Sequence, residues 1–177
     1  VSFSYLPGSC APKAIEGQKK ELSFLTVNLC IMPKATSMIY GGLLPWPVRI
    51  DAIAEELKHL NPDILFLQEV YDVQALSALQ KRLESSYAHF YGNVPAGLYG
   101  FSHASLLPTS GLAVISKFDL ENLQFEPYTT ITNNEPSIEG LYPNHFDRLN
   151  VFGFDRNYGI FHCDVKNGTN TLAHIAT

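Results

Sequence analysis

Two patterns of apolar residues follow one another in the middle of the chain. Between Arg49 and Leu60, four apolar residues recur at helical spacing, with charged residues between them: Ile50, Ile53, Leu57 and Leu60. This predicts an amphipathic helix with Pro47 suited to its first turn. Asn61-Pro62-Asp63 ends the helix, because Pro62 disfavours a helical conformation at Asn61. The unbroken apolar run 64–67 then predicts a strand that is covered on both faces.

The segments on either side predict one more helix and several strands. Residues 21–29 alternate, which places Leu25, Val27 and Leu29 on one face of a strand and Asn28 on the other. Leucines at helical spacing predict a helix over 73–83, with Asp72 as its N-cap.

Shorter apolar runs predict strands over 87–91, 112–116 and 122–132. The runs 158–165 and 171–176 predict a hairpin that turns at Asn167-Gly168. Residues 1–20 contain several Gly and Pro residues, and we expect a loop there.

Three long connections separate these elements, at 30–46, 92–110 and 133–150. Loops of this length are uncommon in compact domains and often functional. The first two combine apolar side chains with Gly and Pro. Two interpretations stay open for 30–46: cover for the core, or an apolar surface for a lipid or another ligand. For 92–110 we expect a surface loop with exposed apolar residues.

The buried strand ends in Gln68-Glu69. A carboxylate at the end of an apolar strand is costly to desolvate unless a partner compensates its charge. Mg²⁺ is such a partner, since it binds oxygen ligands and often needs only one or two protein carboxylates. The spacing alone favours an ordinary ion pair or a solvated carboxylate. Asn28 has a similar alternative, as a side chain that caps the following loop.

The composition indicates one globular domain. The chain has 177 residues, of which 46% are hydrophobic and 16% charged, and its formal net charge is −5. This balance argues against non-specific nucleic-acid binding, which uses basic surfaces. The three cysteines have no metal-ligand spacing, and no apolar run is long enough to span a membrane. Residues 1–12 lack the basic segment of a signal peptide, and we expect a mature or trimmed end there.

Three segments together resemble the endonuclease/exonuclease/phosphatase superfamily, whose members share the deoxyribonuclease I-like fold. Gln68-Glu69-Val70 resembles its Q-E-V signature, residues 25–29 resemble its first core strand, and residues 111–117 resemble its G-apolar-S-basic strand. The resemblance covers about 22–177 and is strongest to the neutral sphingomyelinase-type branch. It implies an α+β fold, a four-layer α/β/β/α sandwich, of which 22–177 is the N-terminal portion and 1–21 an N-terminal extension.

The same resemblance implies a Mg²⁺-dependent phosphoric diester hydrolase. Glu69 would be a catalytic residue and the metal ligand, and Asn28 a catalytic residue that organises the site. Water would attack the phosphorus of a phospholipid head group, as in sphingomyelin, while apolar loops contact the membrane surface. A metal-dependent nuclease, a phosphoinositide-type phosphatase and a non-catalytic binding module with this fold remain alternatives.

The superfamily's later motifs supply the general base and further contacts to metal and phosphate. These motifs, T-H, G-D-x-N and S-D-H, do not occur in the 177 residues. We therefore expect residues 1–177 alone to be inactive or very weakly active.

Overall fold

The computed structural model describes residues 4–12, 21–32, 43–92, 111–127, 159–167 and 170–176. Its elements are β1 (Ser4–Pro7), β2 (Phe24–Ile31), α2 (Trp46–Leu60), β3 (Ile64–Val70), α3 (Val73–Leu83), β4 (His89–Gly92), β5 (Ala113–Ser116), β6 (Leu120–Pro127), β7 (Gly159–Asn167) and β8 (Asn170–Ala176). They form a five-stranded sheet in the order β1-β4-β5-β3-β2 and a three-stranded sheet in the order β6-β7-β8. No helix in these ranges is long and apolar enough to cross a membrane.

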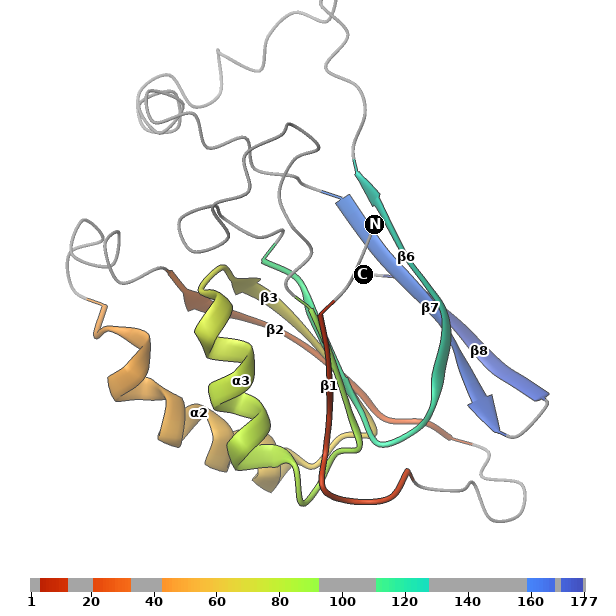
Figure 1. Cartoon of the computed structure of the whole chain (residues 1–177), viewed down its shortest axis with the longest axis horizontal. Coiled ribbons are helices and arrows are strands. Elements are labelled where there is room, and N and C mark those ends of the chain that lie inside the picture. The colour runs from red at the N-terminus through yellow and green to blue at the C-terminus, as the bar shows by residue number, and fades with distance from the viewer. Residues whose placement is uncertain are drawn as a thin grey trace, which may run out of the picture.

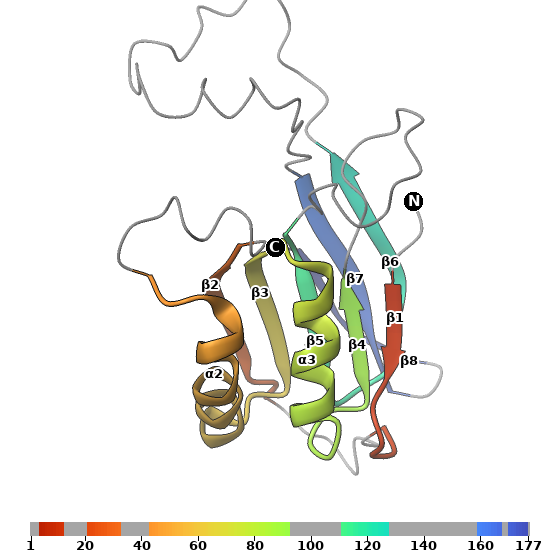
Figure 2. The same ribbon diagram turned by 60° about the vertical axis from the view of Figure 1, so that its left-hand side comes forward.

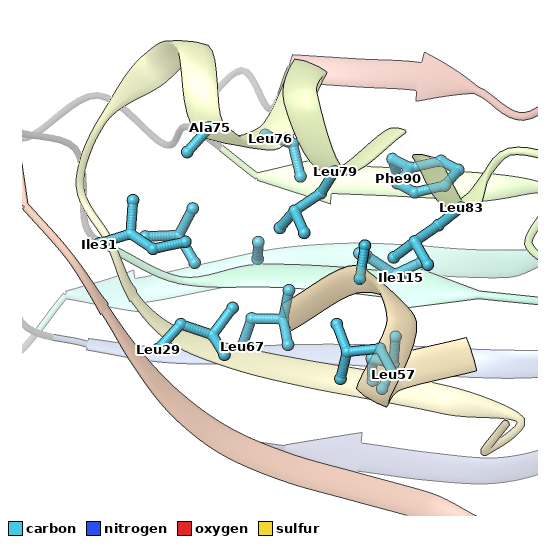
Figure 3. Close-up of a cluster of buried hydrophobic side chains, with 14 of the residues drawn as sticks. Leu29, Ile31, Leu57, Leu67, Ala75, Leu76, Leu79, Leu83, Phe90 and Ile115 are labelled. Atoms are coloured by element: carbon cyan, nitrogen blue, oxygen red, sulfur yellow. The ribbon is translucent and has the colours of Figure 1, made fainter. Parts of the chain in front are cut away.

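The layers are stacked around two apolar cores. Helices α2 and α3 cover one face of the five-stranded sheet, and the three-stranded sheet lies against its other face (Figures 1 and 2). The core under the helices includes Leu67, Leu79 and Ile115 (Figure 3). The core between the sheets includes Phe66 of β3 and Phe161 of β7. The α+β prediction is therefore confirmed, and the described residues supply three of the four expected layers.

Most of the predicted elements are confirmed. Helix α2 has a proline in its first turn and ends at Asn61, which is left-handed at φ 47°. In α3, the backbone N–H of Gln74 donates to the Asp72 side chain at 2.9 Å, as predicted for an N-cap. The hairpin prediction is confirmed by the pairing of Asn167 with Asn170. The long connections fall largely outside the described residues.

Two predictions were wrong. Residues 4–7 are an edge strand and not a loop, since β1 pairs with β4 from Ser4↔Gly92 to Pro7↔His89. Leu60 is 53% exposed, although its spacing placed it on the buried face of the helix. Ala54 lies in the core instead and is fully buried. Leu60 is the last residue of α2, directly before the left-handed Asn61.

Candidate functional site

Asn28 and Glu69 lie at the same edge of the five-stranded sheet. Strands β2 and β3 are parallel, so their carboxyl ends meet there (Figure 1). Asn28 is directly opposite Gln68, and Glu69 is the next residue along β3. The structure therefore brings together both residues that the sequence singled out.

A β-bulge marks this edge. Asn28 pairs with Gln68 and Ile31 pairs with Val70, so two residues of β2, Leu29 and Cys30, lie opposite the single residue Glu69. A bulge of this kind interrupts the ladder of backbone hydrogen bonds and changes the direction of side chains. Cys30 and Glu69 both have left-handed backbones, at φ 48° and 58°.

The left-handed conformation of Glu69 determines where its side chain goes. Leu65 and Leu67 of β3 are buried in the core under the helices, and strict alternation would place Glu69 there too. Val70 occupies that core and is 2% exposed, whereas Glu69 is only partly buried and lies outside that core. A left-handed non-glycine residue costs on the order of 1–3 kcal/mol, and such strain is concentrated at functional sites. Asn61 and Asn122 are the other described non-glycine residues with positive φ, and asparagine tolerates this conformation well.

Asn28 is exposed, and its side chain is fixed by the bulge. Its Oδ1 accepts a hydrogen bond from the backbone N–H of Cys30 at 2.9 Å. The side chain thus caps the turn that follows, which was one of the two interpretations of this residue. An amide oxygen only accepts hydrogen bonds, so the Nδ2 group is the part of the amide that can donate to a ligand.

Cys30 connects the two candidate residues. Its thiol hydrogen-bonds to the Glu69 carboxylate, while its backbone N–H binds Asn28. Burial raises the pKa of the Cys30 thiol, and the charge and hydrogen bond of Glu69 raise it further, while Arg49 lowers it. The neutral thiol is therefore the favoured form, and it acts as a weak donor to the carboxylate.

Arg49 lies directly behind the bulge. From α2 its guanidinium donates to the backbone oxygens of Leu29 at 3.0 Å, Cys30 at 2.7 Å and Leu44 at 2.8 Å. Sequence reasoning missed both Cys30 and Arg49. One signal was available for Arg49: a cation near the N-terminus of a helix opposes the helix dipole, which indicates that other partners hold it there.

Gly111 and Lys117, at the two ends of the segment 111–117, make contacts within the fold. Gly111 has φ 72°, and a Cβ there would lie 2.6 Å from the Tyr71 ring, so a side chain would clash. Its carbonyl accepts from the N–H of Val70 at 2.8 Å and so holds the residue after Glu69. Lys117 is 3% exposed and donates to the backbone oxygen of Asn61 at 2.8 Å, at the opposite end of β3.

The side chains at this edge fit a hard divalent cation. Glu69 is half-buried and offers a carboxylate, and its partner Cys30 is only a weak hydrogen-bond donor. Within the described ranges, no group of three His, Cys, Asp or Glu residues is arranged to hold a metal. A cation at Glu69 would thus take its other ligands from water, phosphate or residues outside these ranges, as Mg²⁺ commonly does.

Comparison with known proteins places the chain in a class. The model of the endonuclease/exonuclease/phosphatase family matches residues 35–166, and the chain belongs to that family. Its members are hydrolases that act as nucleases, phosphodiesterases or phosphatases. The sequence is also 36% identical over 94 residues to a 5'-tyrosyl-DNA phosphodiesterase from Caenorhabditis elegans, a match over 52% of this chain and 24% of that protein.

Solved structures with the same fold include a beta toxin from Staphylococcus aureus, with a TM-score of 0.59 at 16% identity. Sphingomyelinase C from Streptomyces griseocarneus has a TM-score of 0.56 at 18% identity. Each match covers 88% of this chain but only 49% and 47% of the respective structures. These neighbours confirm the deoxyribonuclease I-like fold, and the chain spans about half of their length.

Proposed function

We propose that the full-length protein is a Mg²⁺-dependent phosphodiester hydrolase with Glu69 as a metal ligand. The observation that carries this proposal is the left-handed Glu69, which places a carboxylate outside the core where Val70 takes its expected position. Bound Mg²⁺ would supply positive charge to a phosphate oxygen.

The described residues would bind and orient. Glu69 would hold the cation. Asn28, on the neighbouring strand β2, would donate from its Nδ2 group to a phosphate oxygen. The general base would come from residues outside the described ranges or from segments beyond residues 1–177. We therefore propose that the full-length protein is required for turnover.

A phospholipid head group is the proposed substrate. Three apolar side chains at the start of α2 are exposed, by 41% for Leu43, 61% for Leu44 and 65% for Val48. The carbonyl of Leu44 binds Arg49, the same side chain that holds the bulge, so this apolar surface lies next to the candidate site. The net charge of −5 also favours a lipid over DNA.

A 5'-tyrosyl-DNA end is the second candidate substrate. It is supported by the 36% identity to the phosphodiesterase from Caenorhabditis elegans. The two candidates differ in what lies beside the phosphate, a membrane surface or a DNA strand.

The test is hydrolysis by the full-length protein with Mg²⁺, on sphingomyelin vesicles and on a 5'-tyrosyl oligonucleotide. We expect release of phosphocholine, loss of at least tenfold in activity for Glu69→Gln, and lower activity on vesicles for the double variant Leu44→Ser, Val48→Ser. Cleavage of the oligonucleotide alone would establish the second candidate. Full activity of Glu69→Gln on either substrate would contradict the role of Glu69.

A further inference from the structure

We infer that Arg49 is a positioning residue for the metal site. Its guanidinium fixes the bulge, which directly follows Asn28 and lies opposite Glu69. This inference rests on the proposed function, since it concerns the affinity of the same site for Mg²⁺. Arg49 does not act on the substrate itself and works through the backbone of β2.

Arg49 provides hydrogen bonds to the backbone of the bulge. The residues Leu29 and Cys30 lie opposite one residue of β3, so they lack the regular register with that strand. Backbone carbonyls near a core need partners, and a bulge leaves part of the ladder without them. The Nη1 and Nη2 atoms of Arg49 donate to the carbonyls of these two residues, at 3.0 and 2.7 Å.

Cys30 links Arg49 to both candidate residues. Cys30 is held at φ 48°, and its N–H orients the Asn28 amide at 2.9 Å. The thiol of the same residue binds the Glu69 carboxylate. If the carbonyl of Cys30 were released, we expect its backbone to relax toward a more common conformation, which would move both contacts.

The hydrogen bonds at residue 49 suit an arginine better than a lysine. An arginine fork is planar and rigid, so one group reaches the carbonyls of Leu29 and Cys30 together, while Nε binds Leu44. A lysine has a single ammonium and a flexible stem, and it would hold the two carbonyls less firmly. Arg49→Lys keeps the charge but should therefore restore only part of the effect.

Arg82 on α3 provides a matched control. It also bridges two elements, since its guanidinium binds the carboxylate of Asp51 on α2 and the backbone oxygen of Ala78. Neither contact touches β2 or Glu69. Arg82→Met thus removes an arginine from the same pair of helices without altering the bulge.

The experiment is a calorimetric Mg²⁺ titration of the full-length protein, together with nuclear magnetic resonance of the Asn28 side-chain amide. Partners that orient metal ligands typically contribute 10- to 100-fold in affinity. For Arg49→Met we expect Mg²⁺ affinity to fall by about tenfold or more, with a shifted Asn28 amide signal. Arg49→Lys should lie between this variant and wild type, and Arg82→Met should keep wild-type affinity.

The outcomes separate this inference from the proposed function. If the wild type binds Mg²⁺ and both Arg49→Met and Arg49→Lys bind it with the same affinity as the wild type, the positioning role is overturned. The proposed function would then remain intact. Equal losses in Arg49→Met and Arg82→Met would also overturn it, because the effect would then be general destabilisation. Absence of Mg²⁺ binding to the wild type would overturn the proposed function itself. If Arg49→Met does not fold, Arg49→Lys decides alone, and unchanged affinity would refute the inference.

Discussion

The two ends of β3 each carry a carboxylate, and the two have opposite surroundings. Asp63 precedes the strand and is 6% exposed, whereas Glu69 lies near its other end and is half-exposed. Asp63 accepts hydrogen bonds from the N–H and the hydroxyl of Ser23, both at 3.0 Å, and its Oδ1 lies 3.8 Å from Lys117 Nζ. The charge of Asp63 is thus satisfied within the fold.

The carboxylate of Glu69 has a thiol hydrogen bond from Cys30, with Arg49 bound to the adjacent backbone. Its backbone is left-handed, while Asp63 is absent from the described residues with positive φ. The Asp63 end joins β2, β3 and β5 through contacts within the fold. The Glu69 end carries the carboxylate that we propose as a metal ligand.

The largest effect should follow from Asp63→Asn. This change removes the negative charge that lies 3.8 Å from the ammonium of Lys117, whose side chain is 4% exposed. Breaking a buried ion pair on one side costs about 3–5 kcal/mol in the free energy of unfolding. Urea denaturation would measure the loss. Glu55→Gln is the control, because its pair with Lys58 is exposed and should contribute less than about 1 kcal/mol. Equal stability of the two variants would remove the contrast between the ends of β3.

A smaller effect of the opposite sign is expected for Glu69→Gly. A left-handed backbone costs an L-residue about 1–2 kcal/mol, and glycine removes this cost while adding about 0.5–1 kcal/mol of unfolded-state entropy. The free energy of unfolding should stay equal or rise by about 1 kcal/mol. The control is Gln68→Gly. Gln68 pairs regularly with Asn28, so this variant should be less stable than the wild type. A greater loss for Glu69→Gly than for Gln68→Gly would mean that the Glu69 side chain supports the fold.

The smallest effect concerns pH at the Asp63 end of the sheet. His89 lies at this end because it pairs with Ser116, which also pairs with Ile64, the residue after Asp63. Burial lowers the pKa of His89 from its ordinary 6.5, and Asp119 partly opposes this shift. The Tyr5 hydroxyl faces its Nδ1 at 3.1 Å, and Asp119 Oδ1 lies 3.0 Å from its Nε2. The unfolded chain therefore takes up a proton first as pH falls below 6.5, and stability declines from there toward the lowered pKa.

Unfolding measured between pH 7 and 5 should show this decline in wild type and a shallower one in His89→Gln. An unchanged slope in His89→Gln would show that His89 does not contribute to the pH dependence of unfolding.

The sequence predicted the elements of the fold where local signals were strong. The Asp72 cap, the Pro47 start and the Asn61 end of the helices were each recognisable from one or two residues. The edge strand Ser4–Pro7 was not, because its four residues contain a proline and its stability comes from pairing with β4, eighty residues away. Long-range pairing has no local pattern.

The sequence pattern pointed to one of the two candidate residues, Glu69, because it follows a buried apolar run. Asn28 was singled out by the resemblance to the superfamily, and the pairing of Asn28 with Gln68 brings the two residues together. The bulge depends on register, and the left-handed backbone of Glu69 depends on Val70 filling the core, so neither could be read locally. Most residues of the loops that were expected to contact a membrane lie outside the described residues.

The most direct test of the account is a calorimetric Mg²⁺ titration of the full-length protein, comparing wild type, Glu69→Gln and Glu56→Gln, with urea denaturation of each in the absence of metal. Glu56 is an exposed carboxylate on α2 and serves as the control. The account predicts that Glu69→Gln abolishes Mg²⁺ binding while its free energy of unfolding stays within about 0.5 kcal/mol of wild type. Undiminished Mg²⁺ binding by Glu69→Gln would contradict the account and leave Glu69, like Asp63, a structural carboxylate.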